Sequence, residues 1–247
     1  METLGLPDTV HACLFDLDGV LTPTAAIHAA AWKQMFDAFL RERQGPDARP
    51  FDSVGDYDEY VDGRPRADGV RTFLASRGIS LPEGEDDDPP ERETVHGLGN
   101  RKNLLVLDAI RRQGVQPYPG SVRYVDAARA AGLATAVVSS STNCRDVLEA
   151  AGIADRFDTV VDGNTAHQRK LAGKPHPDTF LAAARDLGVT AGQAAVFEDA
   201  LAGMDAGRAG DFGFVVGVDR VGQRDALREH GADTVVTDLA QLLEADR

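Results

Sequence analysis

Two aspartates, Asp16 and Asp18, are the first residues in the chain whose types and spacing could support chemistry. They close an apolar run, residues 10–15, which predicts a short buried strand with both carboxylates at its carboxyl end. Two carboxylates this close repel each other unless a cation lies between them, and such oxygen ligands suit a hard ion such as Mg²⁺. Gly19 lets the chain turn away at once. An Asp-x-Asp-Gly sequence also occurs in turns and calcium loops, so the interpretation depends on residues further along.

Four more polar residues of the right types follow an apolar run or a turn downstream. Because ligands bind at the carboxyl ends of parallel strands, we expect these side chains to gather near the first pair. A carboxylate pair, a hydroxyl, a lysine and a second acidic pair, in this order, predict a phosphoryl-transfer site rather than unrelated surface turns. The four residues are Ser139, Lys174, Glu198 and Asp199.

Apolar runs and helical patterns alternate along most of the chain, which predicts an α/β fold with a Rossmann-like parallel sheet and right-handed crossovers. Expected strands cover residues 10–16, 135–138, 159–161, 194–197, 212–218 and 234–236. A stretch of helical patterns interrupts this alternation after the first strand. We therefore expect an α/β core domain formed by residues 1–23 and 117–247, with a helical cap domain, residues 24–116, inserted between them.

Within the insertion, the patterns predict helices at about residues 24–43, 56–61, 65–75 and 102–113. We expect residues 97–100, which contain two glycines, to form a loop that directs Lys102 towards the site. The acidic and proline-rich residues 81–93 are expected to form a solvent-exposed loop.

Composition limits the classes of partner. The 247 residues carry a formal net charge of −14, which disfavours nucleic acids and anionic membranes. No apolar run approaches the ~18 residues needed to span a bilayer. The two cysteines, Cys13 and Cys144, form no Cys-x-x-Cys motif, and we expect a cytoplasmic monomer. An enzyme this acidic must concentrate its few cations where it binds phosphate, and the candidates are Arg66, Lys102 and Lys174.

These residues lie in motifs that resemble those of the haloacid dehalogenase (HAD) superfamily over nearly the whole chain. Within it, the chain is similar to the β-phosphoglucomutase-like subfamily. The similarity rests on the sequences DLDGVLT at 16–22, DGRPR at 62–66, GNRK at 99–102, GKPHPD at 173–178 and FEDALAG at 197–203, together with His28 and Trp32.

The resemblance implies a Mg²⁺-dependent enzyme that works through an aspartyl phosphate on Asp16. Asp18 would be the general acid and base, and Ser139 and Lys174 would hold the phosphate being transferred. The metal ligands would be Asp16, the backbone carbonyl of Asp18, Glu198 and Asp199.

The resemblance to the subfamily also implies the substrate, a phosphorylated sugar. The reaction would convert β-glucose 1-phosphate to glucose 6-phosphate through a bisphosphate. The implied contacts with the sugar and with the second phosphate are His28, Trp32, Arg66, Lys102, Ser141 and Asn143.

Two positions depart from the subfamily pattern. Pro23 stands where an acidic residue is usual, and Thr142 stands where mutases carry a lysine near the phosphate that is not being transferred. Loss of that cation keeps open a second function, a sugar-phosphate phosphatase in which water accepts the phosphoryl group. A third possibility is a non-catalytic phosphate-binding protein, although the complete set of acid, metal-ligand and lysine residues argues against it.

Overall fold

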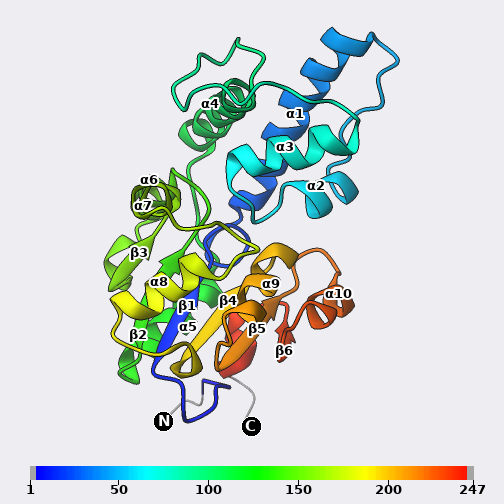
Figure 1. The fold of residues 1–247 in the computed structure, drawn as a ribbon. Coiled ribbons are helices and arrows are strands. Elements are labelled where there is room, and N and C mark those ends of the chain that lie inside the picture. Colours follow the sequence, from blue (N-terminus) through cyan, green and yellow to red (C-terminus); the bar gives the residue numbers. More distant parts are fainter. Residues whose placement is uncertain (1–3, 244–247) are drawn as a thin grey trace. The chain divides into compact units, whose positions relative to one another are not determined.

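The computed structural model describes residues 4–243, which form two compact units. The core unit consists of the chain up to Pro23 and from Val115 onward, and the helical unit is Thr24–Gly114. In Figure 1 the core unit contains all the labelled strands, and the helical unit contains helices α1 to α4. None of the described helices is long and apolar enough to cross a bilayer.

A six-stranded parallel sheet with the strand order β3-β2-β1-β4-β5-β6 forms the centre of the core unit. Its strands are Ala12–Phe15 (β1), Ala134–Val138 (β2), Thr159–Val161 (β3), Ala194–Glu198 (β4), Phe214–Val218 (β5) and Thr234–Val236 (β6). Phe15, at the end of β1, is in register with Val137 of β2 and Phe197 of β4. The carboxyl ends of these three strands therefore meet at one edge, and the predicted α/β class is confirmed.

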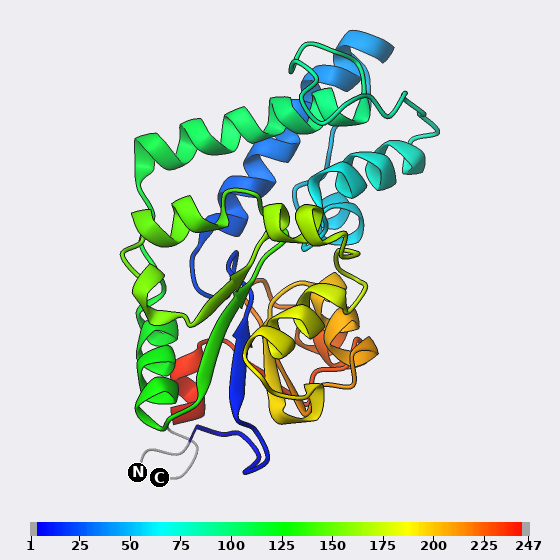
Figure 2. The ribbon, with the colours of Figure 1, turned by 60° about the vertical axis from the view of Figure 1, so that its left-hand side comes forward.

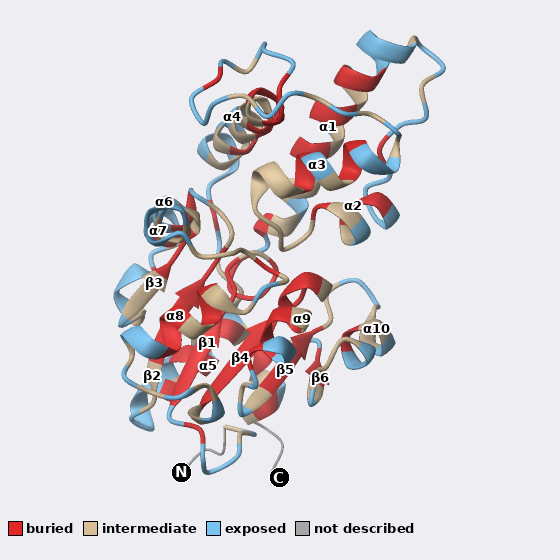
Figure 3. Cartoon of the chain, viewed as in Figure 1, coloured by how far each residue is buried: buried red, intermediate tan, exposed pale blue. Residues whose placement is uncertain are grey.

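Helices cover both faces of the sheet, and this is why its strands are mostly apolar. Figure 2 shows α5 (Pro119–Ala130) on one side of the sheet and α8 (Asp178–Asp186) with α9 (Leu201–Ala209) on the other. The strands alternate accordingly: Leu14 belongs to the apolar cluster with α8 and α9, whereas Phe15 stacks on Phe197 with ring centroids 4.5 Å apart. In Figure 3 the central strands are buried.

Short elements complete the core unit: α6 (Cys144–Ala150), α7 (Gly163–Arg169), α10 (Arg224–Glu229) and three 3₁₀ segments, Ala154–Arg156, Ala191–Gln193 and Leu239–Leu243. The sequence patterns did not predict α7, which buries none of its residues and so has no apolar stripe to detect. It starts because the side chain of Asp162 accepts a hydrogen bond from the backbone N–H of Thr165. The spacing of Leu239, Leu242 and Leu243 predicts a closing helix, but the structure forms a 3₁₀ turn there.

The helical unit has its own apolar centre. Its helices are α1 (Thr24–Gln44), α2 (Gly55–Tyr60), α3 (Arg66–Ser76) and α4 (Val95–Gln113). Phe36 of α1 lies in the middle, with its ring centroid 4.1 Å from that of Phe73 and 5.3 Å from that of Phe51. Trp32 stacks on Phe36 at 5.2 Å. Trp32 and Phe36 belong to α1, so its apolar face packs within this aromatic cluster.

Residues 97–100 are helical, so the expectation of a loop is wrong. Helix α4 begins at Val95, because Thr94 caps it by accepting a hydrogen bond from the backbone N–H of Gly97 at 3.0 Å. A Cβ atom at Gly97 would lie 2.2 Å from the carbonyl oxygen of Arg92. The glycine therefore permits a close backbone contact, and it does not mark a flexible segment.

The acidic residues 81–93 are irregular, as expected, but their exposure is uneven. Asp88 is buried, with 4% of its surface exposed. Its carboxylate accepts hydrogen bonds from the hydroxyl of Thr94 at 2.7 Å and from the backbone N–H of Glu85 at 3.2 Å, and it pairs with Arg92. These bonds fold the segment against the start of α4.

The close contact at Gly97 yields a stability prediction. We expect Gly97→Ala to lower the free energy of unfolding by about 1–3 kcal/mol, because the new methyl group has no room and the backbone must move. The matched control is Gly192→Ala, where an added Cβ meets nothing within 4 Å. Urea unfolding of both variants checks this, and equal losses at the two positions would contradict it.

Candidate active site

The ends of β1, β2 and β4 bring four of the predicted site residues to one edge of the core sheet. Asp16 follows β1, Ser139 follows β2, and Glu198 and Asp199 lie at the end of β4. All four side chains are buried. The backbone N–H of Asp16 donates to Phe197 at 2.9 Å, which continues the pairing of β1 with β4 up to the carboxylate itself.

Lys174 is the cation of this cluster. Its ammonium, on a side chain that is 1% exposed, donates to Asp16 Oδ1 at 2.5 Å, to the carbonyl of Val138 at 3.1 Å and to Glu198 Oε1. Burial opposes the charge, but the two carboxylates outweigh it and raise the pKa of Lys174 above its ordinary value. The lysine is therefore a fixed positive charge at the end of β1.

One ammonium does not neutralise the carboxylates around it. Burial raises the pKa of Asp16 to about 6 and that of Glu198 to about 7, although Lys174 opposes both shifts. Oxygen atoms of Asp16, Glu198 and Asp199 lie within 4.8 Å of one another. Three buried carboxylates and one lysine leave a net negative charge that a bound cation would balance. Because all the donor atoms of the carboxylates are oxygens, a hard cation fits this set. The side chain of Asp18 is not a member of this set of three.

Two glycines leave the space that these carboxylates occupy. Gly19 has φ +89°, and a Cβ atom there would lie 1.7 Å from Asp199 Oδ2. A Cβ atom on Gly203 would lie 1.9 Å from Glu198 Oε1. The carboxylates of Asp199 and Glu198 thus lie directly against the backbone at Gly19 and Gly203. Gly19 therefore provides space for a carboxylate in addition to the turn expected from the sequence.

The loop after β2 presents hydroxyl groups. Ser139 Oγ accepts a hydrogen bond from the backbone N–H of Ser141 at 3.1 Å, and Ser141 Oγ accepts one from the N–H of Asn143 at 3.2 Å. Each hydroxyl accepts in these contacts, so its proton can still be donated to an anion. Asn143 precedes α6 but makes no side-chain cap bond. Behind the loop, Asn164 donates to the carbonyl of Thr142 at 2.8 Å.

The loop after β5 supports both acidic motifs, and the sequence analysis did not identify it. Arg220 donates from Nε to the carbonyl of Gly19 at 2.8 Å, and its guanidinium lies 3.8 Å from the ring centroid of Tyr118. Gln223 donates from Nε2 to the carbonyl of Asp199 at 2.9 Å. The sequence could have indicated this loop by its position alone, because it follows the carboxyl end of an expected strand, where sites form in parallel sheets.

Three predicted residues of the helical unit lie together. The Nζ atom of Lys102 is 2.9 Å from His28 Nδ1 and 4.7 Å from the ring centroid of Trp32. Lys102 is 5% exposed, and its ammonium group lies against the face of an aromatic ring and next to an imidazole. Burial, and then the Lys102 ammonium, lower the pKa of His28 well below its ordinary value. A neutral imidazole can accept the lysine's hydrogen bond.

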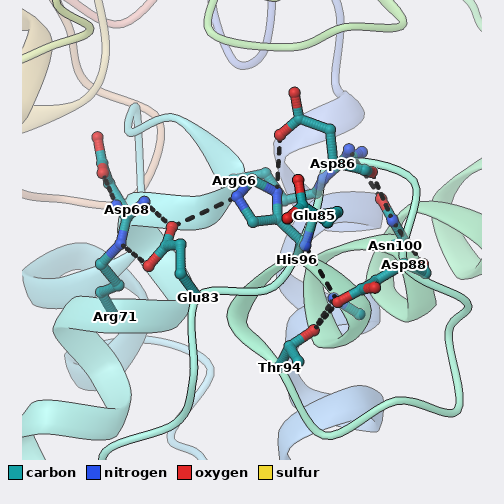
Figure 4. A network of polar contacts seen from close by, with 11 residues as sticks. Arg66, Asp68, Arg71, Glu83, Glu85, Asp86, Asp88, Thr94, His96 and Asn100 are labelled. Carbon is teal, nitrogen blue, oxygen red and sulfur yellow. Dashed lines mark hydrogen bonds and ion pairs between the residues drawn. The ribbon is translucent and has the colours of Figure 1, made fainter.

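Arg66, the remaining predicted cation, begins α3 and contacts α4. Its Nη2 atom donates to Asn100 Oδ1 at 3.1 Å, within the polar network drawn in Figure 4. Asn100 lies in the GNRK motif, but the sequence alone indicated no role for its side chain.

The low pKa of His28 yields a second prediction. We expect its ring to titrate, in an NMR titration from pH 8 downward, at a pH well below the ordinary value of about 6.5. Lys102→Met should raise the pKa, because it removes the adjacent positive charge, whereas the control Lys33→Met should not. Near its ordinary pKa, His28 binds a proton in the unfolded chain but not in the folded one. Its contribution to the free energy of unfolding therefore decreases as the pH falls below about 6.5. Titration of the wild-type ring at its ordinary pKa would contradict this account.

Known proteins resemble the chain along most of its length. Residues 10–211 match the haloacid dehalogenase-like hydrolase family. A β-phosphoglucomutase of Mycobacterium bovis is 58% identical over 98% of this chain and 95% of its own, and one of Bacillus subtilis is 31% identical over 94% and 92%. The crystal structure of a Clostridium difficile β-phosphoglucomutase, 27% identical, superposes with a TM-score of 0.75 over 94% of this chain and 93% of its own. The chain therefore belongs to the haloacid dehalogenase superfamily and, within it, to the β-phosphoglucomutase-like subfamily.

Proposed function

We propose that this protein is a Mg²⁺-dependent β-phosphoglucomutase, which converts β-glucose 1-phosphate to glucose 6-phosphate through a bisphosphate intermediate. The observation that carries the proposal is the 58% identity to a mycobacterial β-phosphoglucomutase over nearly the full length of both chains. We also propose, from the sequence, a monomer that works in the cytoplasm.

Asp16 is the nucleophile in this proposal. Its carboxylate attacks phosphorus, the bond from phosphorus to the sugar oxygen breaks, and an aspartyl phosphate forms. Asp18 donates a proton to the departing sugar oxygen. In the other half of the cycle Asp18 takes a proton from the free hydroxyl of β-glucose 1-phosphate, which attacks the aspartyl phosphate and gives the bisphosphate. The bisphosphate then passes its other phosphoryl group to Asp16 and leaves glucose 6-phosphate. The contact with Lys174 supports this assignment, because it fixes one oxygen of Asp16.

Phosphoryl transfer depends mainly on positioning and on neutralising charge, and the core unit offers groups for both. Lys174 and the hydroxyl of Ser139 hold the oxygens of the phosphate being transferred. Mg²⁺, when bound, supplies the positive charge that the buried carboxylates lack. Its ligands in this proposal are Asp16, the carbonyl of Asp18, Glu198 and Asp199.

Residues of the helical unit bind the sugar and the phosphate that is not being transferred. A single described hydrogen bond holds the guanidinium of Arg66, at Nη2. This bond uses one of the two N–H groups of Nη2, so one edge of the guanidinium, Nη2 with Nε or with Nη1, stays suited to a bidentate contact with phosphate. The complete proposed set of substrate contacts is His28, Trp32, Arg66, Lys102, Ser141 and Asn143.

A sugar-phosphate phosphatase is the second candidate, and the observation that favours it is Thr142. A threonine cannot supply the positive charge of the lysine that mutases carry there. In this alternative every step at Asp16 is the same, but water takes the place of the second sugar hydroxyl.

The nucleophile can be tested directly. We expect Asp16→Asn to lower turnover by about a thousandfold or more, because an amide does not accept the phosphoryl group. Asp8→Asn, an exposed position in the same unit, is the control and should leave turnover unchanged. Circular dichroism checks that both variants fold. Near-normal turnover by a folded Asp16→Asn variant would refute the role of Asp16.

The reaction itself is tested by its products. We expect glucose 6-phosphate to form when the protein is incubated with Mg²⁺, β-glucose 1-phosphate and a trace of the bisphosphate, with little free phosphate released. EDTA should stop the reaction and added Mg²⁺ should restore it, since the carboxylate set needs a second cation. Release of phosphate from several sugar phosphates, without any glucose 6-phosphate, would establish the phosphatase instead.

A further inference from the structure

The side chain of Asn100 joins three segments of the helical unit. Its Oδ1 atom accepts a hydrogen bond from Arg66 Nη2 at 3.1 Å, while its Nδ2 atom donates to the carbonyls of Asp86 at 3.0 Å and Asp88 at 2.9 Å (Figure 4). Two carbonyl groups require the two protons of the amide nitrogen, so the amide oxygen must point to the guanidinium. The orientation of Asn100 is thereby fixed without any ligand.

The acidic segment that anchors Asn100 is itself held in place. The Asp88 carboxylate accepts hydrogen bonds from Thr94 and from the backbone of Glu85, and Asp86 pairs with His96 Nδ1 at 3.1 Å. Both Thr94 and His96 belong to the first turn of α4 or its cap. The two carbonyls that bind Asn100 are therefore fixed to the same helix that carries it.

Backbone space also defines the path of Arg66. A Cβ atom at Gly99 would lie 3.2 Å from Arg66 Cγ and 3.4 Å from its Cδ and Nε. The aliphatic part of the arginine thus passes directly over this glycine before the guanidinium reaches Asn100. Any side chain at position 99 would push Arg66 away from its present course.

Charge distinguishes this arrangement from an ordinary ion pair. The hydrogen bond to Asn100 restricts one nitrogen of the Arg66 guanidinium. Because the Asn100 amide is neutral, this bond does not neutralise the positive charge of the arginine. Asp86 is near enough to influence Arg66, but its carboxylate is engaged by His96. A carboxylate in the place of the Asn100 amide would compete directly with a phosphate for the arginine.

We infer that Asn100 is a positioning residue, which holds Arg66 ready for a phosphate group while keeping its charge available. The inference rests on the proposed function, in which Arg66 binds the phosphate that is not being transferred. By the same reasoning, the acidic segment contributes through the backbone carbonyls of Asp86 and Asp88.

The test compares Asn100→Asp and Asn100→Ala with Arg66→Ala and with the double variant Arg66→Ala/Asn100→Asp. Glucose 6-phosphate formation is measured as a function of the bisphosphate concentration. Gln113→Glu is the matched control, since it adds the same charge at an exposed site in the last turn of α4. We expect Asn100→Asp to raise the half-saturating bisphosphate concentration about tenfold or more, Asn100→Ala to raise it less, and the control to change nothing.

The double variant separates positioning from a general structural effect. If Asn100 acts through Arg66, adding Asn100→Asp to Arg66→Ala should have no further effect on half-saturation. An equal effect of Asn100→Asp with and without Arg66, or no effect of either Asn100 variant, would overturn the inference and leave the proposed function standing. If Arg66→Ala itself leaves half-saturation unchanged, the proposed role of Arg66 fails first, and the role of Asn100 fails with it.

Discussion

The buried ion cluster around Lys174 is the constraint that shapes the core unit. Removing one member of a buried charged pair costs about 3–5 kcal/mol, because the remaining charge has lost its water and its partner. Lys174 faces Asp16 and Glu198 at once, so three segments far apart in the sequence must meet at one point. The parallel pairing of β1 with β4 makes this meeting possible, because it places the ends of both strands side by side.

Electrostatics also explains how a chain with a net charge of −14 can attract a phosphorylated substrate. The three cations proposed to bind phosphate lie in defined local environments. Lys174 is enclosed by the site itself, Lys102 lies against an aromatic ring and a neutral imidazole, and Arg66 is held by an amide. The described hydrogen-bond partner of Arg66 is thus a neutral group, which leaves its positive charge in place. Such local arrangements offset the unfavourable field of the whole molecule.

Much of the core could be predicted because its signals are local. An apolar run that ends in Asp16, Ser139 or Glu198 gives both the strand and the position of the polar group. Residues 97–100 were mispredicted because glycines are poor helix formers in general, whereas Gly97 is required by a contact with Arg92 that no local pattern reveals. The arginine at position 220 was beyond such reasoning, since it binds a carbonyl 201 residues away in the sequence.

Because β1 is a central strand, its two hydrogen-bonding edges are completed by segments that are synthesised long after it. One edge pairs with β2, from Ala134, and the other with β4, from Ala194. The buried residues of the apolar cluster in the helical unit lie between Trp32 and Leu98, so they leave the ribosome before β2 and β4. On a growing chain β1 is therefore present first, and its pairing is complete only after β4 has been made. Its four apolar side chains must stay out of wrong pairings for as long as the synthesis of some 180 residues takes, which at roughly 5–20 residues per second is about ten to forty seconds.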